Sequence, residues 1–198
     1  MNMIRVLLGV GALAFLLGGC MGGARVSKDL VDLARETRTG GEFVMEVDEH
    51  GKVINADAQV DVSRVPKHLV EAAEREVPGP VVSAEREIAQ GKRYWEVEKK
   101  VQGRSIFLML SDDGKVVGRE DELAQGAWPK NVVDAVNKAV PGGPIRTIEL
   151  VTGPEALGGT EYHVKKDVGG EILRISVLKD GTVTRYVRKI RGEFKPPR

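Results

Sequence analysis

Hydrophobic residues recur at helical spacing in two separate segments of the chain. The repeated positions are Val65, Leu69, Ala73 and Val77 in the first segment, and Trp128, Val132, Val136 and Val140 in the second. Residues spaced in this way share one face of a helix, so each segment predicts an amphipathic helix. Pro66 and Pro129 suit a first helical position, where the missing N–H costs nothing. A Pro-Gly pair then ends each helix.

After each predicted helix the pattern changes to a period of two. Trp95, Val97, Lys99 and Val101 alternate with Tyr94, Glu96, Glu98 and Lys100, and Tyr162, Val164 and Val168 alternate with Glu161, His163, Lys165 and Asp167. This alternation predicts antiparallel strands with one buried and one solvated face. Asp113-Gly114 and Asp180-Gly181 predict two-residue hairpin turns in which both residues have positive φ.

The two halves of the chain also resemble each other. Residues 65–79 align with residues 128–142 at an offset of 63, and seven of these fifteen positions are identical. The strands that follow align at an offset of 67. We therefore expect an α+β fold of two tandem helix-plus-antiparallel-sheet units, with the helices packed on one face of the sheet. A leading hairpin at about 43–57 is expected to complete an edge of that sheet.

The N-terminus has the composition of an export signal. Arg5 precedes an uncharged apolar run over residues 6–17, which is shorter than the roughly 20 residues of a membrane-spanning helix. The next residues, Leu17-Gly18-Gly19-Cys20, resemble the bacterial lipobox, in which the cysteine thiol accepts a diacylglycerol. The resemblance implies a lipoprotein held in the bilayer by acylated Cys20 and facing the periplasm. The residue after the cysteine is Met21 rather than aspartate. In this respect the chain resembles lipoproteins of diderm bacteria that are sent on to the outer membrane, so we expect the outer rather than the inner membrane.

These features divide the chain into four parts. We expect a lipoprotein signal peptide at 1–19, a lipidated tether with a short helix at 20–41, the hairpin with the first repeat unit at 42–122, and the second unit with a basic tail at 123–198.

Composition narrows the possible chemistry. The 30 basic and 29 acidic residues nearly balance, which argues against a nucleic-acid partner. The single cysteine excludes an intramolecular disulfide and a cysteine-based zinc cluster. The three histidines, His50, His68 and His163, show no metal-ligand spacing, and no serine lies in a Gly-x-Ser-x-Gly setting. We therefore expect no catalytic residues, no metal site and no cofactor.

The repeated unit is similar to the PepSY-like domains of bacterial envelope proteins. The resemblance rests on Pro66, Val77-Pro78-Gly79, Tyr94-Trp95-Glu96-Val97 and Asp113-Gly114-Lys115-Val116, and on Pro129, Val140-Pro141-Gly142, Tyr162-His163-Val164 and Asp180-Gly181-Thr182-Val183. The nearest variety is described as similar to the beta-lactamase inhibitory protein. This resemblance implies a non-catalytic module of the cell envelope, of a kind proposed to bind or inhibit proteins such as peptidases.

The candidate binding surface is the polar side of the predicted sheet. Its residues are Glu96, Glu98, Lys100, His163, Lys165 and Asp167. On this interpretation the chain is a membrane-anchored lipoprotein whose mixed charges orient a protein or peptide partner. Two alternatives stay open: a sensor of a small ligand or metal ion that uses the cleft between the repeats, and a polar side that is merely solvated.

Overall fold

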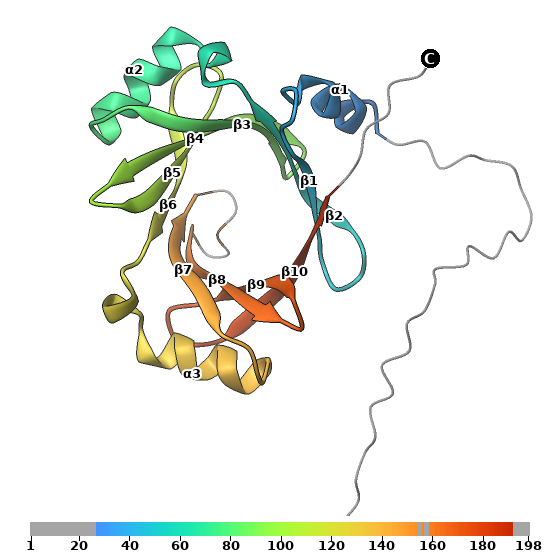
Figure 1. The fold of residues 1–198 in the computed structure, drawn as a ribbon, viewed down its shortest axis with the longest axis vertical. Helices are drawn as coiled ribbons and strands as arrows, with labels where there is room; N and C mark the ends of the chain where they lie inside the picture. Colours follow the sequence, from blue (N-terminus) through green and yellow to red (C-terminus); the bar gives the residue numbers. More distant parts are fainter. Residues whose placement is uncertain (1–26, 154–155, 157–158, 192–198) are drawn as a thin grey trace, which may run out of the picture.

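Ten strands form one ring, and the helices lie outside it (Figure 1). The computed structural model describes residues 27–153, 156 and 159–191. The strands are β1 (Phe43–Val47), β2 (Val53–Val60), β3 (Val81–Ala89), β4 (Lys92–Val101), β5 (Arg104–Leu110), β6 (Val116–Glu122), β7 (Ile145–Thr152), β8 (Thr160–Val168), β9 (Glu171–Val177) and β10 (Val183–Arg191). The helices are α1 (Lys28–Glu36), α2 (Lys67–Glu76) and α3 (Lys130–Ala139), with short 3-10 turns η1 (Val62–Arg64) and η2 (Gln125–Ala127) before α2 and α3.

The predicted fold class, two helix-plus-sheet units, is wrong because the strands close into a single antiparallel barrel. The leading hairpin was expected to finish a sheet edge. Instead β1 pairs with β10 and β2 pairs with β3, so the hairpin joins the two ends of the sheet. β6 pairs with β7 and joins the two halves on the other side. Closure satisfies the backbone groups that an open edge would leave unpaired.

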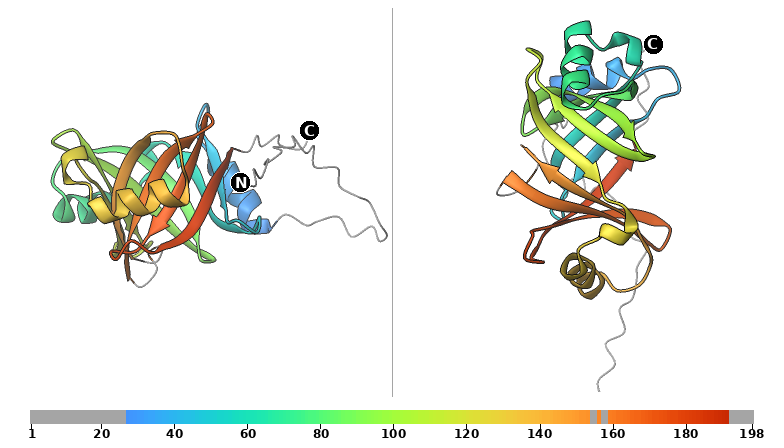
Figure 2. Two further views of the ribbon diagram at one scale, coloured as in Figure 1. Left: turned by 90° about the horizontal axis from the view of Figure 1, so that it is seen from below. Right: turned by 90° about the vertical axis from the view of Figure 1, so that its left-hand side faces the viewer.

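Three apolar clusters lie between the barrel wall and the external helices, and a smaller one, formed by Ala89, Tyr94 and Met109, faces the inside. Leu69 and Ala73 of α2 pack on wall residues such as Val97 and Leu108. Val132 and Val136 of α3 pack in the same way on residues that include Val164 and Ile175. A smaller cluster joins Leu33 of α1 to Ala56 and Ala58 of β2. The outward-facing strand positions are therefore apolar under the helices, and α2 and α3 lie on opposite sides of the barrel (Figure 2).

The hairpin turns differ from the predicted type. Gly114 and Gly181 have positive φ, at 85° and 90°, but Asp113 and Asp180 do not. The Gly114 N–H donates to the Ser111 carbonyl and the strands then shift register, as in a turn followed by a bulge. Two-residue turns with positive φ at both positions occur instead at Gln90-Gly91, Gln102-Gly103 and Gly169-Gly170.

The predicted signal peptide and Cys20 lie outside the described residues. Within the part of the chain that the structure describes, each helix is too short or too polar to cross a membrane.

Candidate functional site

Charged side chains line the inside of the barrel. Successive strand residues point to opposite faces, and Val164 packs outward in the cluster that contains α3, so its neighbour His163 points inward. We define the inner ion network as the side chains of Glu46, Glu120, Glu149, Glu161, His163, Lys165 and Arg174, which are joined by the short contacts described below. They come from five strands: β1, β6, β7, β8 and β9.

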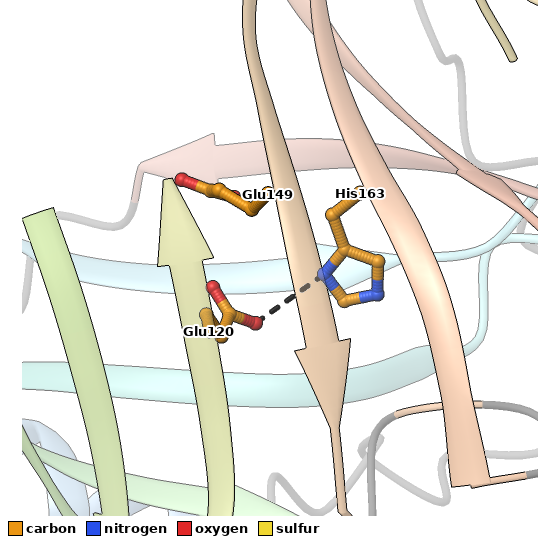
Figure 3. A group of neighbouring side chains, drawn as sticks. All are labelled: Glu120, Glu149 and His163. Atoms are coloured by element: carbon orange, nitrogen blue, oxygen red, sulfur yellow. Dashed lines mark ion pairs between the residues drawn. The ribbon is translucent and has the colours of Figure 1, made fainter. Parts of the chain in front are cut away.

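His163 occupies the centre of the inner ion network and is fully buried. Its Nε2 lies 2.9 Å from Glu161 Oε1. Its Nδ1 lies 3.3 Å from Glu120 Oε1, as the dashed line in Figure 3 marks. Burial and the Arg174 charge would lower the pKa of His163, but hydrogen bonds to Glu120 and Glu161 raise it above its usual value. An imidazolium that donates from both nitrogens accounts for both contacts.

The carboxylates of the inner ion network have different environments. Burial alone would raise the pKa of Glu120, but the hydrogen bond and charge of His163, with Lys165 and Arg174, lower it to about 2. The pKa of Glu149 is raised, first by burial and then by the nearby charge of Glu120. Lys165 Nζ donates to Glu149 Oε1 at 2.7 Å, whereas Glu149 Oε2 is buried and has no hydrogen-bond partner among the described residues.

Arg174 connects the histidine to the other side of the closed sheet. Its Nη2 pairs with Glu46 Oε2 of β1, and its Nη1 lies 3.2 Å from His163 Nδ1. Burial opposes ionisation of Glu46, but Arg174, Lys189 and His163 lower its pKa. Both Glu46 and Arg174 are buried, so removing either one would leave the other charge with less compensation.

The structure separates the predicted binding residues into four places. His163 and Lys165 belong to the inner ion network. Glu98 and Lys100 form a second pair, at 2.7 Å, with Ser105 bonded to both. Asp167 pairs with Arg146 at 2.6 Å outside these networks, and half-buried Glu96 lines a small hollow with Glu120 and Val151. The polar side of the sheet is therefore largely the inside of the barrel, and Lys100 keeps a side chain that is 48% exposed.

Sequence reasoning missed the partners of His163. Glu120, Glu149, Glu161 and Arg174 each sit at an inward strand position, and Glu149 lies directly opposite His163 in the β7–β8 register. The available signal was the alternation of Glu149 with Ile148 and Leu150, which marks a strand position on the polar face. This alternation shows that Glu149 lies on the polar face of its strand. It does not show which other strands bring side chains close to that face.

A segment in the first half of the barrel matches a known protein family. Residues 66–119 match the family model described as "Peptidase propeptide and YPEB domain", or PepSY. This segment contains α2, β3, β4, β5 and the start of β6. No curated protein matches the chain.

Solved structures give weak similarities to about two thirds of the chain. One is a DUF2874 family protein from Bacteroides uniformis, with 13% identity and a TM-score of 0.47, covering 64% of this chain and 89% of that one. Another is a BLIP-like protein from Bacteroides fragilis, with 13% identity and a TM-score of 0.47, covering 67% and 91% respectively.

The inward-facing carboxylates of Glu85 and Glu98 have pKa values shifted in opposite directions, which predicts opposite effects on the pH dependence of stability. Burial raises the pKa of Glu85. The charges of Lys189 and Lys165 oppose this shift, and those of Glu42 and Glu98 add to it. A raised folded-state pKa means that the ionised carboxylate destabilises the fold at neutral pH and that this penalty disappears below the unfolded-state pKa. We expect Glu85→Gln to raise the free energy of unfolding near pH 7 but not near pH 4, as measured by urea denaturation.

Glu98→Gln is the matched comparison. Burial opposes ionisation of Glu98, but hydrogen bonds from Lys100, Ser83 and Ser105 lower its pKa. Its carboxylate therefore stabilises the fold above the unfolded-state pKa, and this stabilisation is lost as the pH falls through the folded-state value. Glu98→Gln should thus destabilise the protein near pH 7. Equal signs for the two variants at neutral pH would contradict this assignment.

Proposed function

We propose that this chain is a lipid-anchored, non-catalytic protein of the bacterial envelope that binds another protein or a peptide. The observation that carries the binding role is the match of residues 66–119 to a family described by peptidase propeptides. The lipobox-like segment at 17–20 supports export and anchoring, and Met21 supports the outer membrane as destination.

The surroundings of the buried serine and histidine support a non-catalytic role. Ser176 lies opposite His163 in the β8–β9 register, which is the arrangement most similar to a nucleophile beside a base. However, the Ser176 hydroxyl makes no hydrogen bond among the described residues, and both side chains are fully buried. A substrate would not reach this hydroxyl in the closed barrel.

Anchoring is tested by Cys20→Ser. The variant lacks the thiol that accepts the diacylglycerol, so we expect it to keep its signal peptide or to leave the lipoprotein membrane fraction. Membrane fractionation and intact-mass measurement distinguish the processed, acylated chain from the unprocessed one. Unchanged fractionation and unchanged mass would reject the lipid anchor without affecting the binding proposal.

Partner binding is tested with the full chain purified from detergent-solubilised envelopes. We expect an envelope protein to co-purify with it in fixed proportion, and recovery of the chain alone would reject the binding role. Lys100→Glu alters the most accessible charge of the candidate binding face. Lys92→Glu, an exposed position at the opposite end of β4, is the matched control. Loss of the partner in Lys100→Glu alone would support this end of the barrel as the contact, whereas equal retention would exclude it.

A further inference from the structure

Three metal-ligating side chains converge inside the barrel, from neighbouring strands. Glu120 comes from β6, Glu149 from β7 and His163 from β8 (Figure 3). One ligand atom from each lies within 4.8 Å of the others. Zinc bonds of about 2.0–2.1 Å place neighbouring ligand atoms about 3.4 Å apart in a tetrahedral site. The 3.3 Å between His163 Nδ1 and Glu120 Oε1 already fits this spacing, so a small movement of Glu149 completes three ligands.

A second observation concerns the far side of the histidine ring. The buried carboxylate of Glu161 accepts a hydrogen bond from His163 Nε2 at 2.9 Å. Metal-binding histidines almost always donate their other ring N–H to a carboxylate, carbonyl or water, which fixes the tautomer and the ring orientation. Here the contact holds the ring with Nδ1 facing the Glu120 carboxylate, and a Glu149 carboxylate oxygen lies within 4.8 Å (Figure 3).

A third observation is the incomplete compensation of buried polar groups. Glu149 is 3% exposed, and its Oε2 has no hydrogen-bond partner among the described residues. Such an atom keeps the cost of its lost hydration unless a cation or donor meets it. The inner ion network also contains four carboxylates against two permanent cations, Lys165 and Arg174, while Lys189 reaches Glu46 from a 43% exposed position. With His163 neutral, the carboxylates of the network outnumber its cations, and a cation beside Glu149 Oε2 would reduce this excess.

We propose that the inside of the barrel holds a divalent transition-metal ion, such as Zn²⁺, bound by His163 Nδ1 and the carboxylates of Glu120 and Glu149. Glu161 acts as the positioning residue behind His163. One imidazole with carboxylates is a ligand set that favours such ions over Mg²⁺ and Ca²⁺. Binding displaces the Nδ1 proton to solvent, and the ion supplies positive charge beside Glu149 Oε2, which lacks a hydrogen-bond partner among the described residues.

The two neighbouring cations are compatible with this arrangement. Lys165 bonds Glu149 through Oε1 and leaves Oε2 for the ion. Arg174 holds Glu46 through Nη2, so its Nη1 can leave His163 Nδ1 without loss of that ion pair. Glu120 keeps a side chain that is 16% exposed and lines a small hollow with Val151 and Thr152, so it is the ligand of the three that lies nearest to solvent.

The test is zinc binding by the full chain, purified in detergent and stripped with EDTA. We expect isothermal titration with Zn²⁺ at neutral pH to give one ion per chain and Mg²⁺ to give no comparable signal. His163→Gln should weaken zinc binding by at least about 100-fold, and Glu161→Gln by about 10–100-fold, the range for residues that support a ligand. His50→Gln, at an exposed turn residue, is the matched control and should bind as the unmodified chain does.

Imidazole NMR of the unmodified chain covers the case in which the variants fail to fold. The chain has three histidines, and zinc should shift the ring signals of His163 and leave those of His50 and His68 unchanged. Binding of Co²⁺ should also give the intense visible absorption of a four-coordinate site. Absence of stoichiometric zinc binding, unchanged affinity in folded His163→Gln, or shifts confined to His50 or His68 would overturn the proposal. None of these outcomes bears on the lipid anchor or on the protein partner.

Discussion

Arg174→Met is expected to lower the free energy of unfolding by about 3–5 kcal/mol, the usual cost of removing one partner of a buried ion pair. Methionine keeps much of the apolar stem but removes the guanidinium that compensates Glu46, whose exposed fraction is 1%. The remaining partner of Glu46 is Lys189, 3.5 Å away on a side chain that is 43% exposed. Urea denaturation followed by far-ultraviolet circular dichroism measures the loss.

Arg188→Met is the control, because Arg188 is an exposed residue of the neighbouring strand β10. An exposed substitution of this kind should change the free energy of unfolding by less than about 0.5 kcal/mol. The Glu46→Gln variant should in turn make the Arg174→Met change less costly, since the Glu46 carboxylate is then no longer present to lose its guanidinium partner. Equal effects of Arg174→Met and Arg188→Met would show that the buried pair does not contribute to stability.

The Glu46–Arg174 pair explains why the predicted open sheet was wrong. Apart from Lys99 and Lys166 on the outer side and Tyr94 on the inner side, alternation along 94–101 and 161–168 separates an apolar from a charged side of each strand. It assigns the charged side to solvent because a lone carboxylate or lysine does not favour burial. Here carboxylates from β1 and β6 meet cations and His163 from β8 and β9, so the charges compensate one another inside a closed wall. Sequence alternation contains no information on this cross-barrel pairing.

The type of each hairpin turn also could not be predicted from the local sequence alone. Asp113-Gly114 and Asp180-Gly181 do mark chain reversals, because glycine at the second position accepts positive φ. The choice between a two-residue turn and a turn with a bulge depends on the register of the flanking strands. Gln90 and Gln102, both with φ of 51°, adopt the two-residue form although glutamine rarely has positive φ. Pairing of β3 with β4 and of β4 with β5 imposes this conformation.

The candidate metal site depends even more on tertiary structure. Its three ligands are separated by 29 and 14 positions, which follows no local ligand spacing. Absence of a His-Glu-x-x-His motif therefore says little about a site assembled across β6, β7 and β8. The register partner of Glu149 is His163, and that pairing is set by the β7–β8 hairpin.

Lys99 and Lys166 are buried lysines at corresponding positions under α2 and α3. Replacing them is expected to affect the free energy of unfolding in different ways. Lys99 Nζ donates to Glu74 Oε2 at 2.9 Å and to the Val77 carbonyl at 2.6 Å, at the C-terminal end of α2. Lys166 Nζ donates to Asn137 Oδ1 at 2.6 Å beside α3. Both residues are fully buried, but Lys99 has a carboxylate partner and Lys166 has a neutral amide.

Lys99→Met should lower the free energy of unfolding by about 2–3 kcal/mol, because the hydrogen bonds of a charged group are lost and the Val77 carbonyl loses its donor. Lys166→Met should be close to neutral or stabilising, since it removes a buried charge and Asn137 is exposed to water. The pair of variants, measured together by urea denaturation, separates the role of the ammonium from that of the apolar stem, which methionine largely preserves in both. The prediction fails if Lys166→Met lowers the free energy of unfolding more than Lys99→Met does. The contacts of Lys99 with the Glu74 carboxylate and the Val77 carbonyl would then not explain how a buried lysine stabilises this barrel.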